Sequence, residues 1–111
     1  MFNLFGSSVE SVNPEKFDEL RKEGYTIIDV RTQQEFNDAR IENAKLIDIY
    51  KSDFGSKINE LDKDGKYLVY CASGSRSVSA VTKMNKAGIK VALNLTGGIM
   101  SWYRAGKPLV R

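Results

Sequence analysis

The chain has 111 residues, 41% of them hydrophobic and 28% charged, a composition that suits a single folded domain over residues 1–111. Seventeen basic and fourteen acidic residues leave a net charge of +3 without any long basic run, so nucleic-acid binding is not expected. With no histidine and one cysteine, Cys71, the chain has no internal disulfide, no Cys-His or Ser-His-Asp catalytic set and no usual zinc site.

The apolar runs and the N-terminus bear on the cellular compartment. No apolar run is long enough to cross a membrane, so no membrane partner is expected. Met1–Gly6 has neither the basic start nor the apolar core of a signal peptide. The expected location is therefore the cytoplasm.

Strand-like runs alternate with helix-like runs, which is the pattern of a parallel α/β sheet. Asn13-Pro14 is typical of a helix start, with Asn13 as the N-cap and Pro14 in the first turn. The first half of the chain is expected to hold a helix, a strand, a short helix and a brief strand, in that order, at residues 14–24, 25–30, 33–37 and 44–47.

The second half continues the alternation. Phe54, Ile58 and Leu61 have helical spacing, and the turn signal Asp64-Gly65 follows them. The clearest central strand comes next and ends directly on Cys71. After this strand we expect a helix, another strand and a last helix. The central strand and these three elements lie, in chain order, at residues 66–70, 76–88, 91–95 and 98–106.

The segment from Cys71 to Ser77 is the candidate site. It lies between a buried strand and a helix, where open α/β sheets usually bind ligands. Its residues are small, so the backbone can curl tightly, and Gly74 can take a positive φ. The inward-pointing amides of such a loop, together with the start of a helix, form a cradle for an anion. We expect that anion to be the Cys71 thiolate or a persulfide formed from it.

Without histidine, Cys71 needs another activating group. A free thiol has a pKa of about 8.5, and helix starts or nearby cations lower it to roughly 3.5–7.5. Arg76 supplies a permanent charge and a planar fork of donors. The hydroxyls that add donors are those of Ser73, Ser75 and Ser77. We expect Cys71, at the rim of the loop, to attack a sulfur donor without a general base; the alternative is an inert, buried cysteine at a strand end.

Three ordered segments resemble the rhodanese-like sulfurtransferases over nearly the whole chain. They are Asp29-Val30-Arg31 with Glu35-Phe36, Tyr70-Cys71 through Arg76-Ser77, and Leu95-Thr96-Gly97-Gly98 followed by Trp102, Ala105-Gly106 and Pro108. The resemblance implies a three-layer α/β sandwich, with a central, mostly parallel sheet flanked by helices. Two positions depart from the family's pattern: Arg40 replaces a common histidine, and Asn43 replaces a common glycine at a turn where asparagine tolerates the left-handed conformation.

The resemblance also implies the roles of the loop residues. Cys71 becomes the nucleophile that carries the persulfide, and amides of the loop surround the transferred sulfur. The loop residues are Ala72, Ser73, Gly74, Ser75, Arg76 and Ser77. Four residues separate Cys71 from Arg76, as in the loop of sulfurtransferases, whereas the related phosphatases have five and a cradle wide enough for phosphate. No cofactor and no metal are expected.

The implied activity moves sulfane sulfur from a thiosulfate-like anion to a thiophilic acceptor such as cyanide, a thiol or a protein thiol. One alternative is a persulfide carrier or binding module with little activity on small molecules. Others are an inactive interaction domain and a phosphatase or arsenate reductase of the same fold. Loop length argues against the phosphatase, and the single cysteine argues against the reductase because no resolving cysteine is available.

Several residues have two interpretations at this stage. Asp29 and Arg31, at a strand end, either brace the fold through a salt bridge or position the loop. Gly97-Gly98 is either a plain turn or a point of close approach to the loop. Trp102 is expected to be a core anchor, and the alternative is a platform for substrate. Arg76 either stabilises the sulfur and its donor or braces the helix that follows.

Overall fold

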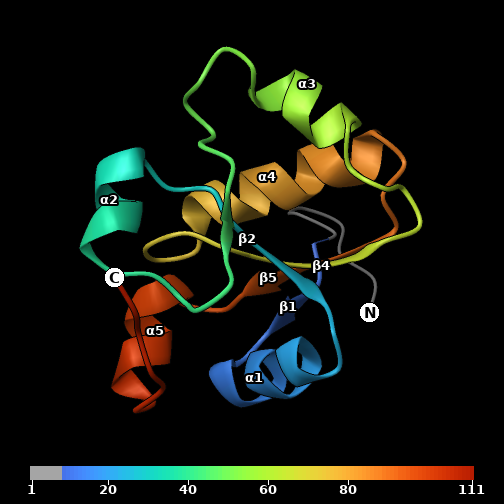
Figure 1. The fold of residues 1–111 in the computed structure, drawn as a ribbon. Helices are drawn as coiled ribbons and strands as arrows, with labels where there is room; N and C mark the ends of the chain where they lie inside the picture. Colours follow the sequence, from blue (N-terminus) through green and yellow to red (C-terminus); the bar gives the residue numbers. More distant parts are fainter. Residues whose placement is uncertain (1–8) are drawn as a thin grey trace.

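The computed structural model describes residues 9–111, and its centre is a five-stranded sheet in the order β1-β5-β4-β2-β3 (Figure 1). Every pairing between these strands is parallel. The strands are β1 (Ser11–Val12), β2 (Thr26–Asp29), β3 (Lys45–Leu46), β4 (Lys66–Tyr70) and β5 (Val91–Leu95). The α/β class with a parallel sheet is confirmed. Strand β1 was not predicted, because two residues are too few to show a pattern of alternation.

Helices cover both faces of this sheet. They are α1 (Pro14–Lys22), α2 (Gln33–Asp38), α3 (Phe54–Asn59), α4 (Ser75–Lys86) and α5 (Gly98–Arg104). Figure 1 shows α3 and α4 on one side of the sheet and α1 and α5 on the other. The result is the expected three-layer sandwich.

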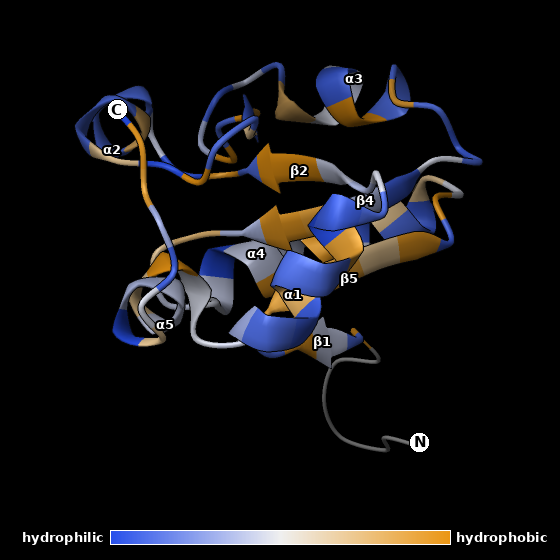
Figure 2. Cartoon of the chain, turned by 60° about the horizontal axis from the view of Figure 1, so that its bottom comes forward, coloured by the Kyte–Doolittle hydropathy of each residue, from blue (hydrophilic) through white to orange (hydrophobic). Residues whose placement is uncertain are grey.

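Each face of the sheet has its own apolar core, and strand β4 contributes to both. Figure 2 shows hydrophobic residues along the central strands β2 and β4. Successive side chains of a strand point to opposite faces. Tyr67 and Val69 therefore join the core beneath α3 and α4, while Leu68 and Tyr70 join the core beneath α1 and α5. Cys71 continues the alternation and lies on the α4 side. The pleat of β4 thus sets the face on which the candidate nucleophile lies.

Local signals in the sequence explain several element boundaries. The Asn13 side chain accepts a hydrogen bond from the Lys16 amide at 2.8 Å, which confirms the predicted N-cap of α1. Asn43 has a φ of +69°, so the turn survives the replacement of glycine at this position. Trp102 is fully buried and donates from its indole to the Pro108 carbonyl, so it is the core anchor that was expected.

The remaining expectations differ from the structure by one or two residues at element ends. Helix α4 begins at Ser75, one residue earlier than expected, and β2 is shorter than the apolar run that contains it. Met1–Gly6, which led us to expect the cytoplasm, lies outside the described residues. Across residues 9–111, no helix combines the length and apolar character needed to span a membrane.

Candidate active site

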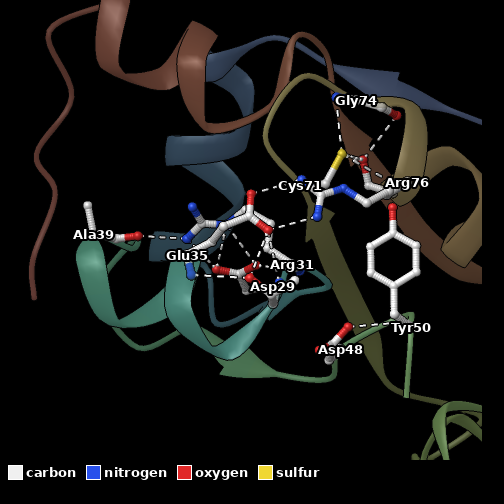
Figure 3. A network of polar contacts seen from close by, with 11 residues as sticks. Asp29, Arg31, Glu35, Ala39, Asp48, Tyr50, Cys71, Gly74 and Arg76 are labelled. Atoms are coloured by element: carbon white, nitrogen blue, oxygen red, sulfur yellow. Dashed lines mark hydrogen bonds and ion pairs between the residues drawn. The ribbon is translucent and has the colours of Figure 1, made fainter. Parts of the chain in front are cut away.

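Cys71 follows β4 directly, and a tight loop carries the chain from it into α4. Gly74 is the N-cap of α4 and has a φ of +114°, a conformation that side chains with a β-carbon rarely adopt. The turn at Gly74 directs two backbone amides at the Cys71 sulfur. Gly74 N–H donates to Sγ at 3.1 Å, and Ser77 N–H donates to Sγ at 3.4 Å (Figure 3). The loop therefore forms the predicted cradle around the sulfur.

The position of Cys71 in the loop corrects one expectation. The residue is only 1% exposed, so it lies at the floor of the loop and not at its rim. Cys71 is buried because the amides of Gly74 and Ser77 lie against Sγ and enclose the sulfur on the α4 side. Of the three serines, Ser77 is buried with its Oγ 3.3 Å from Sγ, whereas Ser73 and Ser75 have exposed side chains.

Burial and hydrogen bonding act on the Cys71 thiol in opposite directions. Burial raises its pKa, because the charged form loses contact with water. Hydrogen bonds with the Ser77 hydroxyl and with the amides of Ser77, Gly74 and Ser73 lower it, because they stabilise the thiolate. The hydrogen bonds prevail, and the pKa of Cys71 lies below its usual value. The loop thus favours a thiolate without an imidazole.

Arg76 makes a two-pronged ion pair with Glu35 of α2 (Figure 3). Its Nη1 and Nη2 lie 2.8 and 3.0 Å from the two carboxylate oxygens. The hydrogen bond from Arg76 lowers the pKa of Glu35 to about 2, and Glu35 together with the negative charge of Cys71 raises that of Arg76. The guanidinium is therefore fixed beside the sulfur by a partner 41 residues away in the sequence. The structure ties α4 to α2, a role that neither sequence interpretation of Arg76 included.

Glu35 has a second role in α2. With Thr32 it forms a capping box, in which the Thr32 hydroxyl accepts from the Glu35 amide and the Glu35 carboxylate accepts from the Thr32 amide. The Thr-x-x-Glu spacing signals this cap in the sequence. It fixes the carboxylate at the start of α2, where Arg76 reaches it.

Replacing Glu35 with glutamine should lower stability at neutral pH while leaving the capping box intact, since glutamine also serves there. A third of the Glu35 side chain is exposed, so solvent screens the pair and we expect a loss of about 1 kcal/mol. The contribution is complete above the ordinary pKa of 4.5 and disappears as the pH falls toward 2. Urea unfolding of the two proteins across this range measures it.

Glu60→Gln is the matched control for this measurement, because Glu60 is an exposed carboxylate just after α3. Its effect on the unfolding free energy should be near zero at every pH. A Glu35→Gln difference that stays constant between neutral and acid pH would show that ionised Glu35 is not its source.

Asp29 and Arg31 form a buried ion pair near the loop. Arg31 Nη2 lies 2.7 Å from Asp29 Oδ2 and also donates to the Ala39 carbonyl, and its guanidinium lies 5.5 Å from the centre of the Tyr70 ring. These contacts join the end of β2 to the end of α2. The arrangement supports the bracing role for both residues.

The start of α5 packs directly on the loop backbone. Ile99 N–H donates to the Cys71 carbonyl at 2.9 Å, and Met100 N–H donates to the Ala72 carbonyl at 3.2 Å. A β-carbon on Gly98 would lie 2.6 Å from the Cys71 carbonyl oxygen, and φ at this glycine is +65°. Gly98 therefore serves close approach to the loop, which settles the two interpretations of this turn.

A cavity of about 360 Å³ borders the loop. Its lining includes two cations from α4, Arg76 and Lys83, and the exposed Tyr50, whose ring lies 5.9 Å from the Arg76 guanidinium. Figure 3 shows the Tyr50 side chain extending toward Arg76. Tyr50 and Lys83 were not predicted as site residues, because an isolated tyrosine or lysine gives no signal in a single sequence.

The fold and the site define an α/β protein with a parallel sheet, in which a strand-to-helix loop points backbone amides at the sulfur of a cysteine. Comparison with known proteins agrees: the rhodanese-like domain family matches residues 13–105, and the chain belongs to that family.

Known relatives specify the family further. A "Sulfurtransferase" from Allochromatium vinosum is 33% identical over 79% of this chain and 80% of its own length. "Thiosulfate sulfurtransferase 18" from Arabidopsis thaliana is 31% identical over 91% and 83% of the two chains. The crystal structure of a rhodanese-related protein from Thermoplasma volcanium is 36% identical, covers 91% of this chain and 97% of its own, and has a TM-score of 0.81. These similarities place the chain in the sulfurtransferase family.

Proposed function

We propose that this protein is a thiosulfate sulfurtransferase that carries the transferred sulfur on Cys71 as a persulfide. The observation that carries the proposal is the hydrogen bonding of Sγ, which accepts from the Gly74 and Ser77 amides at the floor of the loop. Donors aimed at one sulfur atom stabilise a thiolate before the reaction and a persulfide anion after it.

The reaction has two displacements. The Cys71 thiolate attacks the outer sulfur of thiosulfate, a new S–S bond forms, and sulfite leaves with the electron pair of the bond that breaks. An acceptor such as cyanide then attacks the terminal sulfur of the persulfide, and thiocyanate leaves while Cys71 returns as a thiolate. Charge balances in both steps without an oxidant or a general base.

The cavity beside the loop supports an anionic donor. Glu35 balances much of the Arg76 charge, so Lys83 adds the positive field that a dianion such as thiosulfate favours. A lone cysteine that must stay unpaired between turnovers suits a reducing compartment, and we propose the cytoplasm.

The phosphatase alternative is disfavoured by the size of the loop. Between Cys71 and Arg76 there are four residues, and the two amides already lie 3.1 and 3.4 Å from a single sulfur atom. A carrier that relays sulfur between proteins uses the same cradle and is the second candidate function; what distinguishes it is slow release of sulfur to small acceptors.

Intact mass spectrometry tests the proposed function. Incubation with thiosulfate should add the mass of one sulfur atom, and subsequent cyanide should remove it as thiocyanate. Cys71→Ala should show no gain, whereas Ser56→Ala, a change at an exposed serine of α3, should behave as the wild type does. A wild-type protein that gains no sulfur from thiosulfate would contradict the proposal, and a sulfur adduct that cyanide releases only slowly would favour the carrier.

A further inference from the structure

The Cys71 sulfur is the first member of a chain of hydrogen bonds that reaches the edge strand β1. Ser77 Oγ lies 3.3 Å from Sγ and 2.5 Å from Asn94 Oδ1, and Asn94 Nδ2 donates to Ser11 Oγ at 3.1 Å. Ser77 is fully buried and Asn94 is 4% exposed. Water therefore has little access to the first two side chains that follow the sulfur in this series of hydrogen bonds.

Asn94 occupies a position that the pleat of β5 assigns to an apolar core. Its neighbour two residues back, Ala92, belongs to the same core as Cys71, while Leu93 and Leu95 face the opposite side of the sheet. A buried amide costs free energy unless it is hydrogen-bonded, so a polar side chain here needs partners. Asn94 finds them in Ser77 and Ser11.

The single proton of the Ser77 hydroxyl limits what this chain can do. The proton has three possible acceptors, which are Asn94 Oδ1, the Gly74 carbonyl and Sγ. The Gly74 carbonyl already accepts from the Val78 amide. While Cys71 is a neutral thiol, its S–H donates to Ser77 Oγ and the Ser77 proton goes to Asn94 Oδ1, so every member is satisfied.

Ionisation of Cys71 reverses the hydrogen bond between the sulfur and Ser77. A thiolate only accepts, so the Ser77 proton turns to Sγ, and Asn94 Oδ1 loses its donor in a buried place. Half a turn of the amide resolves the conflict. Nδ2 then donates to Ser77 Oγ, and Oδ1 faces Ser11, whose exposed hydroxyl rotates to donate.

We propose that Asn94 is a positioning residue whose amide changes orientation as the Cys71 sulfur passes from thiol to thiolate, so that Ser77 always has the partner it needs. In the ionised state, the hydrogen bonds run in one direction, from Asn94 to Ser77 to the sulfur. Bonds aligned in this way strengthen one another. The proposal deepens the proposed function, because it assigns a residue to the control of its reacting sulfur.

Charged groups also lie around the loop that holds this sulfur. Arg76 lies close enough to interact electrostatically with Cys71, and Glu35 of α2 holds it there. The Asp29–Arg31 pair is joined to Tyr70, the residue before Cys71. A neutral substitution at Asn94 alters none of these charges, so a change in titration would report on the hydrogen-bond chain.

The test is the titration of Cys71 in Asn94→Leu, with Asn94→Ala measured alongside because alanine needs no extra room. Ultraviolet absorbance of the thiolate or the rate of alkylation by iodoacetamide follows the one cysteine directly. If the Asn94 amide donates to Ser77 while Cys71 is ionised, removing it destabilises the thiolate more than the thiol. The pKa of Cys71 should then rise by about one unit. A fall would show that Asn94 competes for the Ser77 proton, and no change would show a purely structural residue; either result overturns the proposal.

Two controls complete the experiment. Leu93→Val alters the same strand on its opposite face and should leave the titration unchanged. In a Ser77→Ala background the series of hydrogen bonds from Asn94 to the sulfur is already interrupted, so Asn94→Leu should not shift the pKa of Cys71 further. A full additional shift would also contradict the proposal. Titration is read without any sulfur donor, so its outcome is independent of whether thiosulfate is the substrate.

Discussion

Replacing Gly98 with alanine should destabilise the protein by about 3 kcal/mol and lower thiosulfate turnover at least about tenfold. The added β-carbon would meet two backbone carbonyls, those of Cys71 and Ala72, and a backbone cannot swing aside as a side chain can. The φ of +65° adds strain for any residue with a β-carbon. The loop must therefore move away from α5, and the amides of Gly74 and Ser77 no longer point at the sulfur.

Gly55→Ala provides the matched control, because Gly55 lies within α3 and a β-carbon there would have nothing within 4 Å. Alanine should stabilise this helix by about 0.5–1 kcal/mol, since it restricts the unfolded chain. Chemical unfolding and thiosulfate turnover, measured on both variants, separate the two cases. If Gly98→Ala keeps wild-type stability and turnover, the close approach of α5 to the loop contributes to neither.

Most of the fold could be predicted from the sequence because its elements carry local signals. The cap at Asn13, the apolar alternation of β4 and the helical spacing after the loop each act within a few residues. Their alternation along the chain was sufficient to predict a parallel α/β sheet, and the resemblance to rhodanese-like proteins added the two layers of helices. Strand β1 escaped prediction because its only support is pairing with β5, a contact between distant segments.

The candidate site was predictable in its loop but not in its partners. Glycine and small residues around Cys71 indicate a cradle by their chemistry alone. By contrast, Glu35 and Asn94 reach the loop from α2 and β5, and no local pattern shows which side chains those elements will bring to it. The depth of Cys71 depends on the same tertiary packing, so the sequence placed it at the rim and the structure places it at the floor.

Arg76→Ala should reduce the kcat/KM for thiosulfate by about a hundredfold, the effect of removing one preorganised donor from an anion site. The guanidinium interacts electrostatically with Cys71 and lines the cavity that we propose for the donor. Arg76→Lys retains the charge but loses the fork that fits Glu35, and we expect a loss of about tenfold. Steady-state assays with thiosulfate and cyanide measure both changes.

Glu35→Gln distinguishes the two roles of Arg76 in these assays. It breaks the same ion pair as Arg76→Ala but keeps the guanidinium, and the glutamine carbonyl can still accept a hydrogen bond from it. If Arg76 acts on the donor, Glu35→Gln should retain most of the turnover that Arg76→Ala loses. Equal losses in the two variants would make Arg76 a brace between α4 and α2. Unchanged turnover in Arg76→Ala would mean that the amides of Gly74 and Ser77 hold the sulfur without it.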